Sequence, residues 1–430
     1  MKRISQEILY DDFFLISDDQ RNLIFSPLRR IVFEVFDLGI KEIRKCQKDG
    51  TIESLLMERA VQEKKAMVNR VGRPFKPMRL VLSLTSDCNL RCIYCYAEAG
   101  KQHKTMSWET AKSAIDETIR NLLEEGKEKF QLTFHGGGEP FVAFKLMKKT
   151  VEYVNSKWEG KKDFSVVTNG TLITPEVADW LAENNFRLTV SIDGPPEIQN
   201  RQRPKANGEG SYKDAISGAI LLKERGLKFG LRSTITNANV YLMEDLLKIA
   251  KDLGCGLKLE PFTPVGRGTD EDILSHDAYF EQFMFASELA KEMDVPLKST
   301  YSSGFDPKCI FCAGDGEMFC VLPNGKISTC SRVTKDDDLL AKMFIVGEVL
   351  DQKVEIDAVQ VESLRHLNVM FYDQCKDCFA KWYCMGGCHN TRLLNDGVMP
   401  KDHCDLEMQF LWVNLIESVE SNKKGEKAHD

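Results

Sequence analysis

Three closely spaced cysteines in the first quarter of the sequence are the residues best suited to carry out chemistry. Cys88, Cys92 and Cys95 lie in the run TSDCNLRCIYCYAEAG and have the spacing C-x3-C-x2-C. With 14 cysteines in 430 residues, chance gives this spacing roughly 0.015 times per chain. Three thiolates on one short loop can hold three irons of a four-iron cluster and leave the fourth iron open to an outside ligand. The spacing therefore predicts a reactive iron–sulfur site.

Zinc is the alternative metal for these three thiols. A structural zinc ion normally takes four protein ligands, and the nearest histidine, His103, lies eight residues beyond Cys95. The spacing therefore favours iron and sulfur over zinc.

A second group of cysteines lies in the carboxy-terminal part of the chain. Four of its members have the spacing C-x2-C-x5-C-x3-C, which is specific enough to exclude chance. Metal ligation is the leading interpretation in a cytosolic chain, where disulfides stay reduced, and a pair of zinc-ribbon sites is the alternative. The group consists of Cys309, Cys312, Cys320, Cys330, Cys375, Cys378, Cys384, Cys388 and Cys404.

Six short β-rich runs alternate with amphipathic helical segments between residue 79 and about residue 293. This alternation is typical of βα units around a parallel sheet, and six units predict an α/β fold with a partial barrel. We expect helices at 107–125 and 241–254, among others. The expected strands are 79–85, 129–135, 164–170, 186–194, 228–236 and 256–262.

The two ends of the chain differ from this central part. Near the start, the apolar runs 11–17 and 21–27 predict a hairpin, and 29–36 and 51–65 have apolar residues at helical spacing. After Tyr301 we expect loops rich in Cys, Gly and Asp, and then an amphipathic helix near 405–420. The resulting segments are a small α+β unit (1–78), a partial barrel (79–300), a loop-rich domain (301–410), and a helix with a frayed tail (411–430).

Composition limits the partners of the chain. Its 58 Lys and Arg residues against 65 Asp and Glu give a net charge of −7, without the basic excess of a nucleic-acid-binding protein. No apolar run reaches the length of a membrane span, and the start lacks the apolar core of a secretion signal. We therefore expect a cytoplasmic protein that binds neither nucleic acid nor membrane. Among its other thiols, Cys46 and Cys255 sit between apolar residues and are expected to be buried.

The first cysteine motif, with Tyr94 before its third cysteine, resembles the signature of the radical S-adenosylmethionine (radical SAM) enzymes. The resemblance continues in HGGGEP at the end of the second strand, in SIDGPP after the fourth, and in an arginine on the fifth. A tight turn is the alternative explanation of the glycine run, and a surface salt bridge that of the arginine. The resemblance implies that SAM is bound by Tyr94, Gly137, Gly138, Glu139, Pro140, Ser191, Asp193 and Arg232.

Known members of this family supply the chemistry that the resemblance implies. SAM chelates the open iron, and an electron from the cluster cleaves it to a 5′-deoxyadenosyl radical that abstracts hydrogen from a substrate. The barrel would position the reactants and exclude water. A flavodoxin or ferredoxin would supply the electron. No single residue can be named as catalytic from the sequence.

The carboxy-terminal cysteines resemble the SPASM extension of radical SAM enzymes, in which Gly325 and Cys330 supply the G-x4-C element. The resemblance implies two auxiliary clusters, and hence three [4Fe-4S] clusters in all. Cys330 and Cys388 would bind auxiliary cluster I, with Cys312 the first choice among Cys309, Cys312 and Cys320. Auxiliary cluster II would be bound by Cys375, Cys378, Cys384 and Cys404. The neighbouring His389 and His403 are expected to hydrogen-bond or pack rather than ligate.

SPASM enzymes mostly modify peptides, so the resemblance implies a peptide maturase that forms a thioether or carbon–carbon crosslink. Sulfatase-type oxidation of Cys or Ser is the alternative, but those maturases carry an Asp after the G-x4-C cysteine, where this chain has Ser331 and Arg332. An electron carrier or a zinc scaffold without enzymatic activity is an alternative of a different class. The open cluster and the GGEP element argue against it.

Two further expectations concern the substrate. The amino-terminal unit is large enough to dock a leader peptide, for example by strand addition, although it could equally cap the barrel. Residues that follow strands at the expected barrel mouth could contact substrate, with surface solvation as the competing explanation. These residues are Asp193, Arg203, Glu260 and Arg267.

Overall fold

The computed structural model describes residues 3–60, 62–301, 306–336 and 339–426. The chain divides into two compact units, each built from segments that are distant in the sequence. Unit 1 contains residues 1–71, 301–312 and 366–430, and unit 2 contains 72–300 and 313–365. The division into four consecutive segments remains a proposal about the organisation of the sequence.

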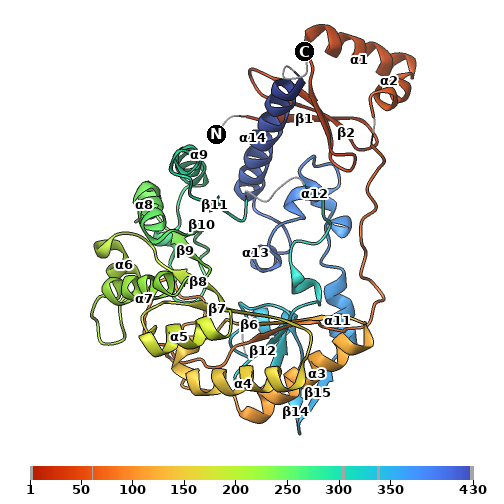
Figure 1. Cartoon of the computed structure of the whole chain (residues 1–430). Helices are drawn as coiled ribbons and strands as arrows, with labels where there is room; N and C mark the ends of the chain where they lie inside the picture. The colour runs from red at the N-terminus through yellow and green to blue at the C-terminus, as the bar shows by residue number, and fades with distance from the viewer. Residues whose placement is uncertain (1–2, 61, 302–305, 337–338, 427–430) are drawn as a thin grey trace. The chain divides into compact units, whose positions relative to one another are not determined.

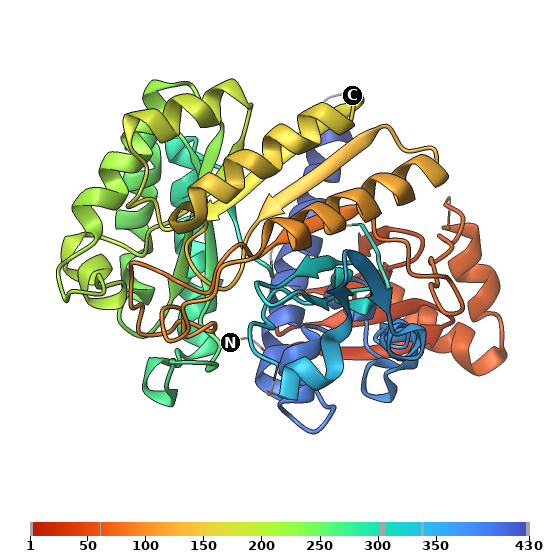
Figure 2. The ribbon, with the colours of Figure 1, turned by 90° about the horizontal axis from the view of Figure 1, so that it is seen from below.

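Unit 2 is built on a parallel sheet whose six strands follow one another in chain order. All six predicted strands are confirmed, as is the α/β partial barrel. Helices lie along the outer face of this sheet (Figures 1 and 2). The strands are β5 (Arg79–Leu82), β6 (Lys129–Phe134), β7 (Lys161–Thr168), β8 (Arg187–Ser191), β9 (Phe229–Ile235) and β10 (Gly256–Pro261). The helices are α3 (Trp108–Glu124), α4 (Phe144–Lys157), α5 (Pro175–Glu183), α6 (Pro196–Gln202), α7 (Tyr212–Glu224), α8 (Met243–Leu253) and α9 (His276–Met293).

The first βα unit shows why the sequence forms these elements. In β6, Phe130, Leu132 and Phe134 alternate with less buried polar residues, as a strand with one apolar face requires. Helix α3 begins where the Ser107 side chain accepts a hydrogen bond from the backbone N–H of Thr110 at 3.0 Å. Its buried residues recur at helical spacing, so the helix packs on the sheet along a single stripe.

The sheet continues beyond β5 with strands that the sequence pattern did not reveal. Strand β12 (Phe319–Val321) pairs in parallel with β5, and β13 (Lys326–Ser328), β14 (Ile345–Leu350) and β15 (Lys353–Ile356) follow it in antiparallel order. At the other edge, β11 (Leu297–Lys298) pairs with β10. The expectation of loops throughout this region was therefore wrong, because strands of three residues are too short to show a period. Two helices complete this part, α10 (Leu339–Phe344) and α11 (Ala358–Arg365).

Unit 1 contains an antiparallel sheet with the order β1-β2-β3-β4. The predicted hairpin is confirmed as β2 (Phe13–Ser17) and β3 (Asn22–Ser26), and β1 (Ser5–Tyr10) pairs with β2. The helix expected at 29–36 was wrong, because the apolar run Ile31–Glu34 forms strand β4 against β3. Of the second expected helix, only α2 (Ile52–Glu58) forms, after α1 (Asp37–Asp49).

Both faces of the unit 1 sheet are buried. On one face, Leu9, Phe13 and Leu15 pack with residues of α1 and α2. On the other, Phe14 and Ile16 share a core with Phe379 and Trp412, and so with the cysteine-rich segment. Trp412 belongs to α14 (Lys401–Glu426), which confirms the expected carboxy-terminal helix, and the short helices α12 (Lys381–Cys384) and α13 (His389–Leu393) lie between the cysteines.

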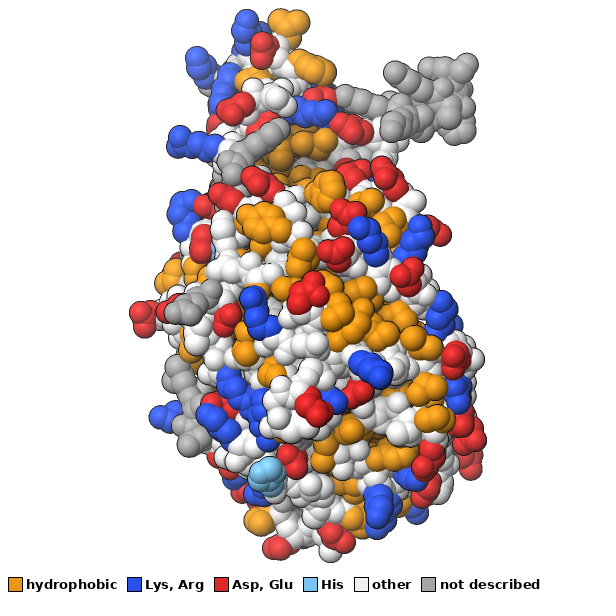
Figure 3. Space-filling model, turned by 90° about the vertical axis from the view of Figure 1, so that its left-hand side faces the viewer, with side chains coloured by type: hydrophobic (Ala, Val, Ile, Leu, Met, Phe, Trp, Pro, Cys, Tyr) orange, Lys and Arg blue, Asp and Glu red, His pale blue; other side chains and the backbone are white. Residues whose placement is uncertain are grey.

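The structure can be compared with the expectations about surface charge, membrane spans and the two isolated cysteines. In Figure 3, acidic and basic side chains are interspersed over the face that is shown. None of the helices in the described ranges combines the length and apolar character that a bilayer span requires. Cys255 is buried as expected, whereas Cys46 is only half-buried beside the α1–α2 core.

Candidate functional site

Cys88, Cys92 and Cys95 lie on the loop after β5 and line a cavity of about 260 Å³ in unit 2. The carboxyl ends of parallel strands meet at one edge of a sheet, and each of the six strands contributes its own end or the loop that follows it to this cavity. Its polar lining includes Tyr94, Glu139, Thr168, Asn169, Ser191, Arg203, Arg232, Thr234, Glu260, Ser331 and Arg332. The structure thus brings the predicted cysteine triplet together with Tyr94, Gly137, Gly138, Glu139, Ser191 and Arg232.

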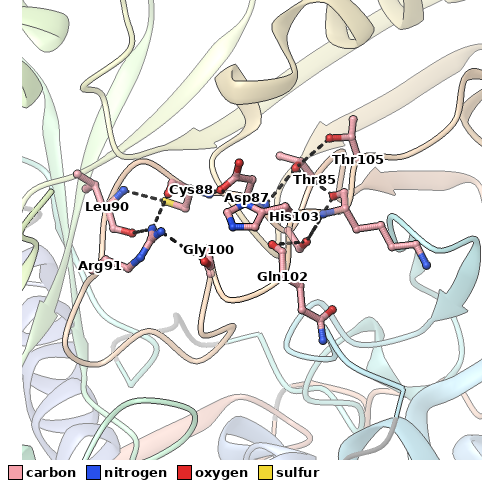
Figure 4. Close-up of polar contacts among 12 residues, drawn as sticks. Thr85, Asp87, Cys88, Leu90, Arg91, Gly100, Gln102, His103 and Thr105 are labelled. Atoms are coloured by element: carbon pink, nitrogen blue, oxygen red, sulfur yellow. Dashed lines mark hydrogen bonds and ion pairs between the residues drawn. The ribbon is translucent and has the colours of Figure 1, made fainter. Parts of the chain in front are cut away.

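The cysteine loop is held by hydrogen bonds within itself, as Figure 4 shows. The backbone N–H of Leu90 donates to Cys88 Sγ at 3.4 Å, and Arg91 Nη1 donates to the carbonyl oxygens of Cys88 (2.6 Å) and Leu90 (2.8 Å). Arg91 also reaches Gly100, where any side chain would overlap the guanidinium. The loop is therefore folded around one arginine that the sequence analysis did not identify.

His103, the histidine nearest to the triplet in the sequence, is directed to a carboxylate in the same loop. Its Nδ1 lies 3.2 Å from Asp87 Oδ1, as Figure 4 shows. Within the described ranges, no three His, Cys, Asp or Glu side chains converge on one metal position. In a four-iron cluster each thiolate binds a different iron, so its ligands need not converge in that way.

The glycine run after β6 packs directly against the cysteine loop. Gly138 N donates to Thr85 O at 2.8 Å, and Glu139 N donates to Asp87 O at 2.9 Å. A Cβ atom at Gly138 would overlap that same Asp87 carbonyl group, and Gly137 has φ +64°. These glycines therefore let two backbone segments approach each other.

Glu139 is buried beside the cavity, and its carboxylate accepts hydrogen bonds from its own chain. The donors are Thr168 Oγ1 at 2.7 Å, Asn169 N at 2.8 Å and Phe141 N at 3.3 Å. Burial raises the pKa of this carboxyl to about 7, against the effect of these hydrogen bonds. Pro140 follows as the first residue of a 3-10 turn, Pro140–Ala143.

Asp193 supports the cavity from behind rather than lining it. Its fully buried carboxylate accepts hydrogen bonds from Arg203 Nε at 2.8 Å, Thr234 N at 3.0 Å and the Tyr94 hydroxyl. The Arg203 guanidinium lies 5.3 Å from the centre of the Tyr94 ring. This network ties the cysteine loop to the ends of β8 and β9, so Asp193 positions Tyr94 and Arg203.

The two other predicted substrate contacts have different surroundings. Arg267 binds the cysteine loop, because its backbone N–H donates to Cys95 O and its Nη1 to Cys92 O, both at 3.1 Å. Glu260 lines the cavity, where it accepts a hydrogen bond from Thr300 Oγ1 at 2.6 Å and pairs with Lys258. Of these two side chains, Glu260 is the one that faces the cavity.

Burial and nearby cations have opposite effects on the thiols of the triplet. Burial raises the pKa of the Cys88 thiol to about 12 and that of Cys92 to about 11, and nearby Arg203 and Arg267 limit the increase at Cys92. Such thiols hold their protons at neutral pH until a metal ion displaces them. Three half-buried cysteines beside two cations fit an anionic iron–sulfur cluster.

The carboxy-terminal cysteines are divided between the two units. Cys320 lies on β12 and Cys330 follows β13, both in unit 2, whereas unit 1 contains the other seven. Of the predicted ligands of auxiliary cluster I, Cys330 belongs to unit 2, and Cys312 and Cys388 belong to unit 1. This ligand set stays a prediction.

The four cysteines assigned to auxiliary cluster II all belong to unit 1 and influence one another. Burial raises the pKa of Cys384 well above its usual value, and Cys375, Cys378 and Cys404 raise it further. Hydrogen-bond donors reach two of the sulfurs, because Arg392 Nη2 lies 3.6 Å from Cys375 Sγ and Gln374 Nε2 lies 3.9 Å from Cys404 Sγ. Such donors tune the potential of a cluster.

One further donor and two histidines complete the surroundings of these cysteines. Asn368 Nδ2 lies 3.5 Å from Cys309 Sγ. The nitrogen Nδ1 of His389 lies 3.3 Å from the Tyr372 hydroxyl, and Nδ1 of His403 lies 3.1 Å from the Tyr301 hydroxyl. Both histidines form hydrogen bonds, as expected. Arg392, Gln374 and Asn368 were not predicted, because their spacing carries no motif.

Known proteins share these features. Residues 82–253 match the sequence pattern of the Radical SAM superfamily. The chain is 30% identical over 365 residues to the serine-type anaerobic sulfatase-maturating enzyme of Bacteroides thetaiotaomicron, covering 74% of this chain and 84% of that enzyme. It is 32% identical over 352 residues to the mycofactocin maturase of Mycolicibacterium smegmatis, covering 78% and 83% of the two chains. The chain is also 38% identical over 170 residues to an uncharacterized protein of Methanocaldococcus jannaschii. That match spans 39% of this chain and 57% of the relative's length.

A solved structure shares the fold. Native anSMEcpe with bound AdoMet and Cp18Cys peptide superposes with a TM-score of 0.62 at 21% identity. The match covers 80% of this chain and 99% of that chain. At this identity the likeness concerns the fold alone.

Proposed function

Since the chain belongs to the radical SAM superfamily, we propose that it is a peptide maturase that abstracts hydrogen from a ribosomally made peptide and forms a thioether or carbon–carbon crosslink. The observation that carries this proposal is the cavity in unit 2, where Cys88, Cys92 and Cys95 meet the GGEP loop and four strand ends. An electron carrier or zinc scaffold has no need of such a cavity beside its cysteines.

The residues of the cavity have distinct roles in this proposal. Cys88, Cys92 and Cys95 would hold a [4Fe-4S] cluster, which together with SAM supplies a 5′-deoxyadenosyl radical after one-electron reduction. The SAM methionine group would bind at Gly137, Gly138 and Glu139, with Ser191 and Arg232 as further contacts. These contacts would orient the reacting groups and keep water from them.

The support of the cysteine loop matters for this chemistry. Tyr94, Asp193 and Arg203 form a buried network, and Tyr94 packs against Phe262 with ring centres 6.4 Å apart. Because the network joins the loop to two strand ends, the loop is held in place before any ligand binds. The chain thus supplies a preorganised site.

We propose two auxiliary [4Fe-4S] clusters in addition, bound by the cysteine sets named above, and a flavodoxin or ferredoxin as electron donor. The four mutually interacting thiols of unit 1 support cluster II. The reduced thiols that these clusters require fit a cytoplasmic location.

Crosslinking is favoured over sulfatase-type oxidation by the residue that follows Cys330. Ser331 lines the cavity at the place where the sulfatase maturases carry an aspartate base, and a serine hydroxyl is not a base at neutral pH. The similarity to a sulfatase-maturating enzyme over 84% of its length favours the second candidate, oxidation of Cys or Ser. The mass change of a modified peptide distinguishes the two reactions.

The proposal is tested by anaerobic reconstitution. The protein should bind about twelve irons and release 5′-deoxyadenosine from SAM on reduction. Replacement of Cys88, Cys92 and Cys95 by alanine should abolish release, whereas Cys375→Ala with Cys378→Ala should impair peptide turnover more than release. Cys46→Ala, outside both groups, is the matched control. Stoichiometric zinc without 5′-deoxyadenosine, or undiminished release by the triple variant, would refute the proposal.

A further inference from the structure

One cation on the cavity wall has no partner in the described part of the chain. The Nη1 atom of Arg332 is buried and donates no hydrogen bond within the described part of the chain, although Arg332 lines the cavity. Two other charged side chains of the cavity have partners, because Arg203 pairs with Asp193 and Glu260 pairs with Lys258. A buried donor without an acceptor is unfavourable, so an acceptor is expected when the cavity is filled.

Arg332 is presented from a fixed turn. Val333 N donates to Cys330 O at 3.2 Å, and Cys330 N donates to Ser328 Oγ at 3.0 Å. The far end of the turn is tied to the cysteine loop by an ion pair between Lys335 and Glu98. The guanidinium is therefore held at the cavity wall by a backbone that is anchored on both sides.

Arg332 and the cations beside the cysteine triplet act on different residues. The cations that act on the Cys92 thiol are Arg203 and Arg267. Arg332 acts instead on Tyr96, where burial raises the pKa of the phenol and Arg232 and Arg332 oppose the increase. Arg232, Arg332 and Tyr96 all line the cavity, so the two arginines form a cationic area of its wall.

SAM brings one carboxylate to the cavity, and Arg232 is the residue assigned to it above. A second guanidinium in the same area then requires a second anion. A guanidinium fork matches a carboxylate through two parallel hydrogen bonds, more closely than it matches a neutral amide. We propose that Arg332 binds a carboxylate of the peptide substrate, either an Asp or Glu side chain or the carboxy terminus, and so selects for an acidic group near the reacting residue.

This inference rests on the proposed function and is tested by binding, not by turnover. Anaerobically reconstituted protein with SAM is titrated with three small probes, and binding is followed by ligand-observed NMR. The probes are N-acetylaspartate N-methylamide for a side-chain carboxylate, N-acetylglycine for a terminal one, and N-acetylasparagine N-methylamide as the neutral match. We expect at least one acidic probe to bind at least tenfold more tightly than the neutral probe, and the preferred probe identifies the source.

Variants assign the preference to one side chain. Arg332→Gln should remove the preference for the acidic probe and leave SAM binding intact, and Arg332→Lys should restore part of it. Arg232→Gln should weaken SAM binding instead. Arg120→Gln, at a side chain that is 63% exposed on α3, is the control and should behave like the wild type.

Two results would overturn the inference. One is equal binding of acidic and neutral probes to the wild type, and the other is loss of SAM binding in Arg332→Gln with the probe preference unchanged. Release of 5′-deoxyadenosine by the same wild-type preparation tests the proposed function separately. Release without a probe preference would therefore remove only this inference.

Discussion

Replacing Asp193 by asparagine should destabilise unit 2 far more than the loss of one hydrogen bond would. The substitution keeps the shape of the side chain but removes the charge that balances Arg203. The two side chains are 0% and 9% exposed and lie 2.8 Å apart. Removing one partner of a buried ion pair costs about 3–5 kcal/mol, because the other charge stays buried without compensation.

The size of the effect can be measured by scanning calorimetry under anaerobic conditions. For a unit of this size, ~1 kcal/mol corresponds to ~2 °C in the unfolding midpoint. Asp193→Asn should therefore lower the midpoint of one transition by roughly 6–10 °C. The double variant Asp193→Asn with Arg203→Gln should recover at least half of this loss, because no unbalanced charge remains. Asp193→Asn should also weaken retention of iron by the cysteine loop, since Tyr94 loses its charged acceptor.

The surface pair of Arg187 and Asp163 provides the matched control. Arg187 is 59% exposed and lies 2.6 Å from Asp163, so Arg187→Gln should cost at most about 1 kcal/mol. If Asp193→Asn were as stable as Arg187→Gln, or if the double variant showed the full loss, the buried pair would not hold this site together.

Two further substitutions test other parts of the structure. Gly138→Ala should reduce 5′-deoxyadenosine release at least tenfold, because its Cβ would overlap the Asp87 carbonyl. The control Gly126→Ala has open space around it and should lower the free energy of unfolding by only about 1 kcal/mol, through its positive φ. Equal release by both variants would contradict this role of Gly138. Burial raises the pKa of Glu407 to about 8, above its unfolded value near 4.5, so the stability of unit 1 should fall as the pH rises between these values. Glu407→Gln should remove a pH-dependent loss on the order of 5 kcal/mol at pH 8.5. The variant should have a higher melting midpoint than the wild type at that pH and no gain at pH 4, and a parallel pH dependence of both proteins would contradict this prediction.

The sequence predicted the six barrel strands because each is bounded by turn residues and followed by a long amphipathic segment. It also placed the cysteine triplet at the carboxyl end of the first strand, since that position depends only on local order. Strands β12 and β13 could not be predicted, because three residues show no period. Residues 31–34 were predicted as helix because four residues also fit a helical stripe, and pairing with β3 decided the outcome.

The hydrogen bonds and ion pairs within the site could not be predicted from the sequence, for a different reason. Asp193 follows a strand and was expected at the barrel mouth, yet its partners Tyr94, Arg203 and Thr234 come from three separate segments. A charged residue near a strand end is compatible with either a substrate contact or a buried support. The choice depends on tertiary packing, as it does for Arg91, which folds the cysteine loop around itself.

The pairing of β12 with β5 has a consequence for folding during synthesis of the chain. Strand β5 is made early, but the strand that covers its free edge is made some 240 residues later, with Phe319 beside Leu80. During synthesis the barrel sheet therefore exposes a row of unpaired backbone groups, and such edges invite association between chains. The edge of β5 stays open until β12 has been synthesised, because β12 is the strand that pairs with it.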